Sequence, residues 1–357
     1  MPANRFLALD ALRGLAVALM ILVNTPGSWQ HVYSPLLHAS WDGFTFADIV
    51  FPAFLFVVGA AMFYALRRAQ ADAATFLRIA KRSALLVLIG ILLNWFPFSG
   101  SLAELRLPGV LQRIGLCYGI AAVLVLLVKR PHLPWLAAIL LALYWLLLQG
   151  TAQQPYSLEH NLVRQLDLAL LGAKHLYQGF GIAFDPEGLL STLPAVASVL
   201  LGYYAAQQLS ERTATAGASW LLTAGLALLL AAWLCSQIWP VNKALWSGSY
   251  VLLTAGLLFW LLAGLLWLSD IKGRQLLLQP LVTYGTNPLF IYVLSWLWAV
   301  TLGLIPVGDT NLYQALFSLL AQFLPAKLAS LLFAVAHVVW FWWLSRLLYR
   351  RNIIIRL

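Results

Sequence analysis

The chain has 357 residues, of which 62% are hydrophobic and only 10% are charged. An ordinary soluble domain carries about 25% charged residues, so this composition excludes a water-soluble globular protein. The net charge of +10 is explained mostly by lysine and arginine on the cytoplasmic face of a membrane protein, so no nucleic-acid partner is expected.

Long apolar runs recur along the chain without the two-residue alternation that would indicate barrel strands. The bilayer core offers no water to backbone polar groups, so these runs are expected to form helices. The sequence predicts one all-α domain over residues 1–357, a polytopic integral membrane bundle of about ten transmembrane helices. The first is expected to be retained rather than cleaved as a signal peptide. The predicted spans are 10–26, 47–66, 82–97, 110–128, 134–149, 189–206, 218–238, 247–268, 281–304 and 328–348.

Basic residues indicate the orientation, because cytoplasmic loops are enriched in lysine and arginine. A cytoplasmic N-terminus with an even number of spans also places the C-terminus inside, and it puts most of the 22 basic residues on the cytoplasmic face. Anionic membrane lipids are the partners expected for such a face. The inside set is Arg5, Arg13, Arg67, Arg68, Arg78, Lys81, Arg82, Lys129, Arg130, Arg212, Lys272, Arg274, Arg346, Arg350, Arg351 and Arg356.

Polar residues cluster in the first outside loop, at the start of the second predicted span. His38 precedes Asp42 and Asp48 there, and Asn24 ends the helix that leads into the same loop. A carboxylate at Asp48 favours the positive N-terminal end of the helix dipole. A histidine in this setting can act as a general base, because its pKa lies near the working pH. The alternative is that His38 and Asp48 serve only as loop and cap residues.

Further polar residues occur in the loop between the seventh and eighth spans and early in the ninth span. Asn242 and Lys243 lie in that short loop, where an outside lysine indicates a functional site or an interface anchor that snorkels. Asn287 lies at the start of the ninth span. An amide at any of these positions can also serve loop backbone alone.

On the cytoplasmic side, Arg5, Arg13 and Arg82 can hold the phosphates of a cytoplasmic ligand. The alternative for each is positive-inside topology together with anionic lipid. No Walker loop, HExxH or GxSxG motif is present, which argues against ATP-driven transport and zinc proteolysis. No metal site is expected.

Seven segments in order resemble the heparan-α-glucosaminide N-acetyltransferase family, including its shorter bacterial inner-membrane homologues. The resemblance covers nearly the whole chain and implies a multi-pass protein of the bacterial inner (cytoplasmic) membrane. The segments are Arg5–Gly14, His38–Pro52, Leu107–Arg113, His175–Gln178, Asp185–Gly188, Asn242–Ser247 and Asn287–Val293.

The resemblance implies that acetyl-CoA is the co-substrate on the cytoplasmic side and that an amino-sugar or glycan acceptor on the far side receives the acetyl group. His38 corresponds to the family's active histidine, acting as general base or acetyl carrier, and Asn24 is its companion. We expect Asp48 and Asp42 to fix the tautomer of His38 or to bind hydroxyls of the acceptor. The expected acceptor-side residues are Trp41, Asp42, Asn242, Lys243 and Asn287, and the expected CoA-binding residues are Arg5, Arg13 and Arg82.

Two other functions fit the same residues. One is a transporter for an amino sugar or related solute, against which stand the absence of an internal repeat and the few polar mid-span residues. The other is an O-acyltransferase that acts on a hydroxyl of envelope glycans. Bundles of this kind often form homo-oligomers, and the sequence carries no GxxxG-type seam strong enough to identify an interface.

Overall fold

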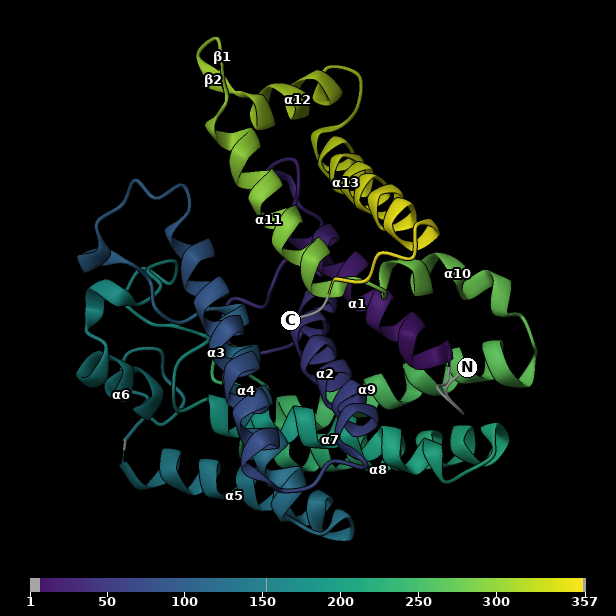
Figure 1. Cartoon of the computed structure of the whole chain (residues 1–357). Coiled ribbons are helices and arrows are strands. Elements are labelled where there is room, and N and C mark those ends of the chain that lie inside the picture. Colours follow the sequence, from purple (N-terminus) through teal and green to yellow (C-terminus); the bar gives the residue numbers. More distant parts are fainter. Residues whose placement is uncertain (1–6, 152, 356–357) are drawn as a thin grey trace.

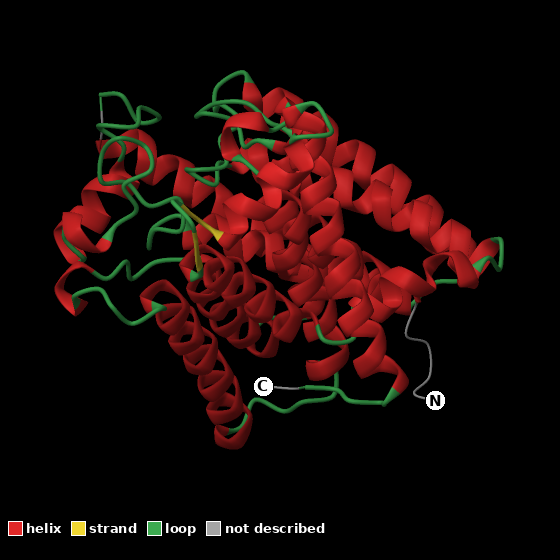
Figure 2. Cartoon of the chain, turned by 90° about the horizontal axis from the view of Figure 1, so that it is seen from above, coloured by secondary structure: helices red, strands yellow, loops and turns green. Residues whose placement is uncertain are grey.

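The computed structural model describes residues 7–151 and 153–355, and regular structure in these residues is helical apart from one short hairpin (Figures 1 and 2). Arg5, predicted to bind CoA, lies outside the described residues. The α-helices are α1 (Leu7–Asn24), α2 (Val50–Leu66), α3 (Ala73–Trp95), α4 (Val110–Leu127), α5 (Leu133–Thr151), α6 (Leu162–Leu170), α7 (Thr192–Ser210), α8 (Ala214–Ser236), α9 (Gly248–Leu266), α10 (Gln275–Tyr284), α11 (Pro288–Leu304), α12 (Leu312–Ala321) and α13 (Ala326–Arg350).

Short elements connect these helices. Strands β1 (Pro306–Val307) and β2 (Thr310–Asn311) pair antiparallel between α11 and α12. A π-helical turn, Trp267–Ile271, extends α9. The 3₁₀ turns are Trp29–His31, Ser34–Leu36, Phe46–Ile49, Leu102–Glu104, Arg130–His132 and Ala173–His175.

Seven helical segments in the described residues are long and apolar enough to cross a membrane, and α10 with α11 forms a bent pair that passes the same test. The all-α polytopic bundle is therefore confirmed, while the number of spans and the location of the termini stay predictions. The predicted spans 82–97 and 189–206 are also helical, as parts of α3 and α7. The seven segments are Leu7–Asn24, Phe46–Leu66, Val110–Leu127, Arg130–Gly150, Ala214–Ser236, Gly248–Ile271 and Ala326–Arg350.

The predicted span 281–304 is not one continuous helix. The chain breaks after Tyr284 and turns by 59° before α11 begins at Pro288. Proline has no backbone N–H and disfavours helical geometry in the residue before it, and Asn287 accordingly has φ −127° and ψ 54°. Hydropathy does not register such a break, because both halves are apolar.

Close helix packing depends on glycine at two interfaces. A methyl group on Gly59 of α2 would overlap the backbone carbonyl of Val199 in α7, and one on Gly202 of α7 would overlap that of Phe56. Gly14 of α1 meets the carbonyl of Leu281 in α10 in the same way. Lipid tails are as apolar as the side chains, so helices in a membrane associate through such tight contacts. These contacts fix α1 and α2 in the middle of the bundle (Figure 1).

The outer helices present large apolar side chains to their surroundings. Trp135 on α5 and Trp233 on α8 are exposed, together with many leucines on the same helices. On a water-soluble protein such a surface would mark an interaction site, whereas here it matches a lipid-facing surface. The polar groups discussed below lie instead around the inner helices and the loops that cover one end of them.

Candidate functional site

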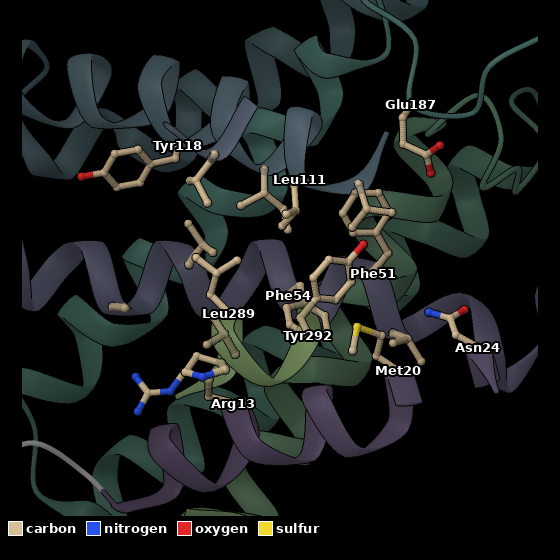
Figure 3. Close-up of a pocket in the computed structure, with 18 of the residues that line it drawn as sticks. Arg13, Met20, Asn24, Phe51, Phe54, Leu111, Tyr118, Glu187, Leu289 and Tyr292 are labelled. Carbon is tan, nitrogen blue, oxygen red and sulfur yellow. The ribbon is translucent and has the colours of Figure 1, made fainter. Parts of the chain in front are cut away.

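A cavity of about 290 Å³ lies between α1, α2, α4 and α11. Asn24 and Glu187 lie at one end of it, and Arg13 and Tyr118 lie at the other (Figure 3). The wall between the two ends is apolar, and its side chains include Met20, Phe51, Phe54, Leu111, Leu289 and Tyr292. The cavity therefore joins two polar ends through a hydrophobic passage.

A second cavity, of about 560 Å³, adjoins the Arg13 end. It shares Arg13 and Arg82 with the first, and it is also lined by Asp10, Tyr64 and Ile354. The end that is predicted to be cytoplasmic thus widens into a larger, basic space.

His38 and Asp48 form a pair at the opposite end. Nδ1 of His38 lies 2.8 Å from Oδ1 of Asp48, whose side chain is fully buried while that of His38 is 46% exposed. An ionised carboxylate can only accept, so Nδ1 of His38 carries the proton that donates to Asp48, and in the neutral imidazole Nε2 is the nitrogen with the lone pair. His38 also lines the cavity, which places an imidazole base at its end.

Local sequence explains why Asp48 is so well held. The Phe46–Ile49 turn begins with a capping box, in which Oδ2 of Asp48 accepts hydrogen bonds from the backbone N and the hydroxyl of Thr45 at 2.9 and 3.0 Å. Oδ2 also accepts from the backbone N of Ala39 at 3.2 Å. The carboxylate therefore fixes both ends of the loop that carries His38.

Lys243 completes this cluster. Its Nζ lies 3.6 Å from Oδ1 of Asp48, and the lysine lines the same cavity. Burial lowers the pKa of Lys243 below its ordinary value, and the carboxylates of Asp48 and Glu187 oppose that shift. Lys243 therefore faces the cavity and the carboxylate of Asp48, and its contact with an acceptor stays a prediction.

Asn24 ends α1 at the same end of the cavity. Its side chain is exposed to the cavity and makes no hydrogen bond to any other described residue, His38 included. Asn24 and His38, expected to act together, therefore share the cavity without a hydrogen bond between them. The amide of Asn24 keeps its full donor capacity for a bound molecule.

Three segments far apart in sequence assemble the loop cover. Nδ2 of Asn242 donates to Oδ1 of Asp42 at 3.0 Å, and Nε1 of Trp41 donates to the carbonyl of Tyr156 at 2.8 Å. Oδ1 of Asn242 also accepts from the backbone N of Leu245 at 2.7 Å, and this asparagine is fully buried. Asn242 therefore holds the loops together, while Asp42 is exposed and Trp41 partly exposed at their rim.

Asn287, predicted to lie with these residues, lies elsewhere. Its amide donates to the carbonyl of Ile353 at 2.9 Å and accepts from the backbone N of Ile355 at 2.8 Å. It thereby ties the C-terminal segment to the break between α10 and α11, beside the larger cavity to which Ile355 contributes. The structure does not bring Asn287 to the His38 end.

The two described arginines predicted to meet CoA both line the basic end. Arg13 donates to the carbonyl of Gly285 and forms an ion pair with Asp10 at 2.8 Å. Arg82 is exposed, and its guanidinium lies 4.8 Å from the ring centroid of Tyr118. Arg82 sits on α3 because this helix begins at Ala73, nine residues before the predicted boundary, with Asp72 as its N-cap.

The sequence reasoning missed a charged network beside the His38 end. Arg106 holds Asp185 through two hydrogen bonds of 2.8 Å and Glu187 through one of 2.6 Å, and Glu187 reaches the cavity. On α4, the buried Arg113 donates to the carbonyl of Gly188 at 2.7 Å. An arginine inside a predicted span is itself a functional signal, and Arg113 could have pointed to this loop.

A neighbouring carboxylate positions the same loop from α6. Oδ1 of Asp167 accepts from the backbone N of Leu189 at 2.9 Å, and its Oδ2 is buried with no hydrogen-bond partner among the described residues. Burial raises the pKa of Asp167 to about 6, against the hydrogen bond from Leu189.

Fold and site together define a multi-pass helical membrane protein that holds a histidine–carboxylate pair at one end of an internal cavity. The family model described as heparan-alpha-glucosaminide N-acetyltransferase, catalytic, matches residues 5–237, and the chain belongs to this family. The chain is 30% identical to the heparan-alpha-glucosaminide N-acetyltransferases of Mus musculus and Homo sapiens, over 82% and 81% of its length. It spans about half the length of these relatives, 53% and 52% respectively.

Proposed function

We propose that this protein transfers an acetyl group from cytoplasmic acetyl-CoA to the amino group of a glucosamine-type sugar on the opposite side of a bacterial inner membrane. The observation that carries the proposal is the continuous cavity, which runs from basic residues at one end to His38 and Asn24 at the other. The names of the two mammalian relatives, which specify N-acetyl transfer to an alpha-glucosaminide, support both the reaction and the acceptor class.

The donor fits the passage in polarity. Arg13 and Asn24 are eleven residues apart on α1, which is roughly 16 Å along the helix axis at 1.5 Å per residue. Phosphates of CoA would meet Arg13 and Arg82 in the wider cavity, and the uncharged arm would cross the apolar passage. The thioester would then reach His38 while the phosphates of CoA stay in the wider cavity and away from lipid.

The chemistry proposed for His38 is general base catalysis. The amine nitrogen attacks the thioester carbonyl, Nε2 of His38 removes a proton from that nitrogen, and the same proton passes to the sulfur as the C–S bond breaks. Asp48 holds the imidazole in the required tautomer and stabilises its cationic form. The amide N–H of Asn24 would donate to the carbonyl oxygen as negative charge develops there.

The acceptor would bind under the loop cover. Trp41 and Asp42 lie at its rim, where an aromatic face and a carboxylate can contact the sugar ring and its hydroxyls. Lys243 faces the cavity from the α8–α9 loop and is proposed to contact the acceptor as well. Asn242 holds these residues in place through Asp42.

The test is acetyl transfer by purified protein in detergent, using acetyl-labelled acetyl-CoA with glucosamine and small glucosaminides. Wild type is compared with His38→Ala, and a thermal unfolding curve shows that the variant is folded. Label should appear on the amine with wild type alone. A folded His38→Ala variant with full activity would contradict the mechanism.

The same assay separates the other functions. An amide product survives mild base and an ester does not, so base-labile label would identify an O-acyltransferase. Sugar uptake by proteoliposomes without acetyl-CoA, together with no transfer of label, would identify a transporter.

A further inference from the structure

Acyl transfer to an amino sugar involves two protons, and the His38 mechanism handles one of them. The balanced reaction is R–NH3⁺ + CoA–S–CO–CH3 → R–NH–CO–CH3 + CoA–SH + H⁺. An N–C bond forms, a C–S bond breaks, and the proton that His38 takes from nitrogen returns to sulfur. The other proton must leave the ammonium before attack, because a protonated nitrogen has no lone pair. Water can take it from the fraction of acceptor that is neutral in solution. A base at the acceptor end would take it from the fraction that binds as the ammonium.

Glu187 is placed to be that base. Its side chain is 10% exposed and lines the same cavity as His38 and Lys243 (Figure 3 shows its carboxylate at the Asn24 end). Oε2 accepts from Nη2 of Arg106 at 2.6 Å. Oε1 makes no hydrogen bond with any other described residue, so one oxygen is held and the other is open to a bound molecule.

Several hydrogen bonds hold the loop around Glu187 in place. Asp185 binds Arg106 through both carboxylate oxygens and accepts from the backbone N of Glu187 at 3.0 Å and of Tyr177 at 3.1 Å. Arg106 also lies 4.8 Å from the ring centroid of Tyr177. Arg113 holds the next residue, Gly188, through its carbonyl. This degree of support is typical of a side chain whose position matters to a reaction rather than of a loop surface.

We propose that Glu187 is a second catalytic base, which takes the first proton from the acceptor's ammonium through Oε1 so that a neutral amine meets the thioester. The inference rests on the proposed acetyl transfer. The proton then leaves to the side from which the acceptor entered, and His38 remains the shuttle between nitrogen and sulfur.

The surrounding charges suit this step. Burial raises the pKa of Glu187, although Arg106 opposes the shift, and a carboxylate with a raised pKa is a stronger base. The cation of Lys243, held by Asp48, repels an entering ammonium and so favours its neutral form. The titratable and charged groups that face Glu187 from neighbouring elements are Arg106, Arg113, Asp185, Lys243, Tyr250 and Tyr292.

The test compares two acceptors, glucosamine and hydroxylamine, because hydroxylamine is largely unprotonated at pH 7 and needs no first proton transfer. The variants are Glu187→Gln, which removes the base but keeps an oxygen for Arg106, and Glu187→Asp, which keeps a carboxylate. Glu104→Gln is the matched control, since Glu104 is an exposed carboxylate paired only with Lys174 at 3.3 Å in the described residues. Thermal unfolding monitors folding of every variant.

With Glu187→Gln, transfer to glucosamine should fall about tenfold at pH 6 and less at pH 7, because an amine that titrates near neutrality is mostly protonated at the lower pH. The loss should shrink as pH rises and the acceptor arrives neutral, and transfer to hydroxylamine should stay within a few-fold of wild type. Glu187→Asp should retain part of the glucosamine activity, and Glu104→Gln should retain all of it.

Two results would overturn the inference alone: no loss with Glu187→Gln, or an equal loss with both acceptors and an unchanged pH profile, which would indicate a structural role. A wild-type protein that acetylates neither acceptor would overturn the proposed function, and this inference with it.

Discussion

Nδ1 of His38 and Oδ1 of Asp48 lie 2.8 Å apart, although ten residues separate them in the chain. The carboxylate is buried and the imidazole lines the cavity. Because Nδ1 is engaged by Asp48, Nε2 is the ring nitrogen that remains for a bound substrate. Both residues belong to the loop that leads into α2, and a single capping box holds that loop closed. The pair is the structural basis for the first prediction.

Replacing Asp48 with Asn should lower kcat by about 100-fold or more with little effect on KM for acetyl-CoA. An asparagine amide at this position can donate to Nδ1 of His38, and this hydrogen bond selects the tautomer that carries its proton on Nε2. A protonated Nε2 cannot accept a proton from the amine. The measurement is steady-state acetyl transfer. Asp72→Asn is the matched control, because Asp72 caps α3 by accepting from Thr75 at 2.8 Å. Equal losses in the two variants would show that only capping matters.

Asn24→Ala should reduce kcat by about 10²- to 10³-fold, the range observed when one donor to a developing oxyanion is removed. The side chain forms no hydrogen bond within the described structure, so the midpoint of thermal unfolding should hardly change. Activity and unfolding are measured on the same preparation. A large drop in the unfolding midpoint, or unchanged kcat, would argue against a role in binding the carbonyl.

Arg82→Gln should raise KM for acetyl-CoA about tenfold while kcat changes little. Hydrogen bonds to charged groups contribute about 1.5–3 kcal/mol, and this contact is proposed to lie far from the reacting atoms. Arg78→Gln on the same helix is the control, because Arg78 bonds to Thr75 at 2.9 Å and does not line either cavity near Arg82. Matching shifts in KM for both variants would point to general surface charge instead.

Asp167→Asn should stabilise the protein near pH 7 and leave it almost unchanged near pH 4. Burial raises the pKa of Asp167 to about 6 in the folded state, so the folded state binds more protons than the unfolded state between pH 4 and 6. The contribution of this carboxyl to stability therefore falls as pH rises through that window. The measurement is the unfolding midpoint of wild type and variant from pH 4 to pH 7.

In that experiment the difference between the unfolding midpoints of the variant and wild type should grow with pH and level off above pH 6. A difference that does not depend on pH would contradict the raised pKa. The backbone N of Leu189 keeps an oxygen acceptor in the asparagine, so loss of that hydrogen bond does not confound the comparison.

Much of the fold can be predicted from the sequence because its signals are local. Hydropathy over a window of twenty residues is enough to identify a helix in a membrane, whatever that helix packs against. The predicted spans accordingly coincide with helices, except that 281–304 is broken between α10 and α11. The position of Asp48 at the start of a helix also follows from local capping chemistry, as the capping box with Thr45 confirms.

Where local signals end, only the tertiary structure decides. Asn242 and Lys243 share one short loop, yet Asn242 is enclosed by backbone partners and Asp42 while Lys243 turns into the cavity. Asn287 looked like a further acceptor-side residue, and packing of the C-terminal segment engages its amide at the other end. Neither outcome is visible in the residue types.

The position of Glu187 shows most clearly why residue types alone do not predict which side chains meet. In sequence it is one acid among several in a long polar loop, 149 residues from His38. The Asp185–Gly188 segment belongs to the family resemblance, but the residue types assign no role to Glu187. It reaches the cavity because Arg106 and Arg113, from the α3–α4 connection and α4, hold its loop against the end of the bundle. The sequence by itself determined a helical membrane protein and its histidine. Tertiary contacts between distant loops decided which carboxylates share a cavity with that histidine, because each such contact depends on residues far away in the chain.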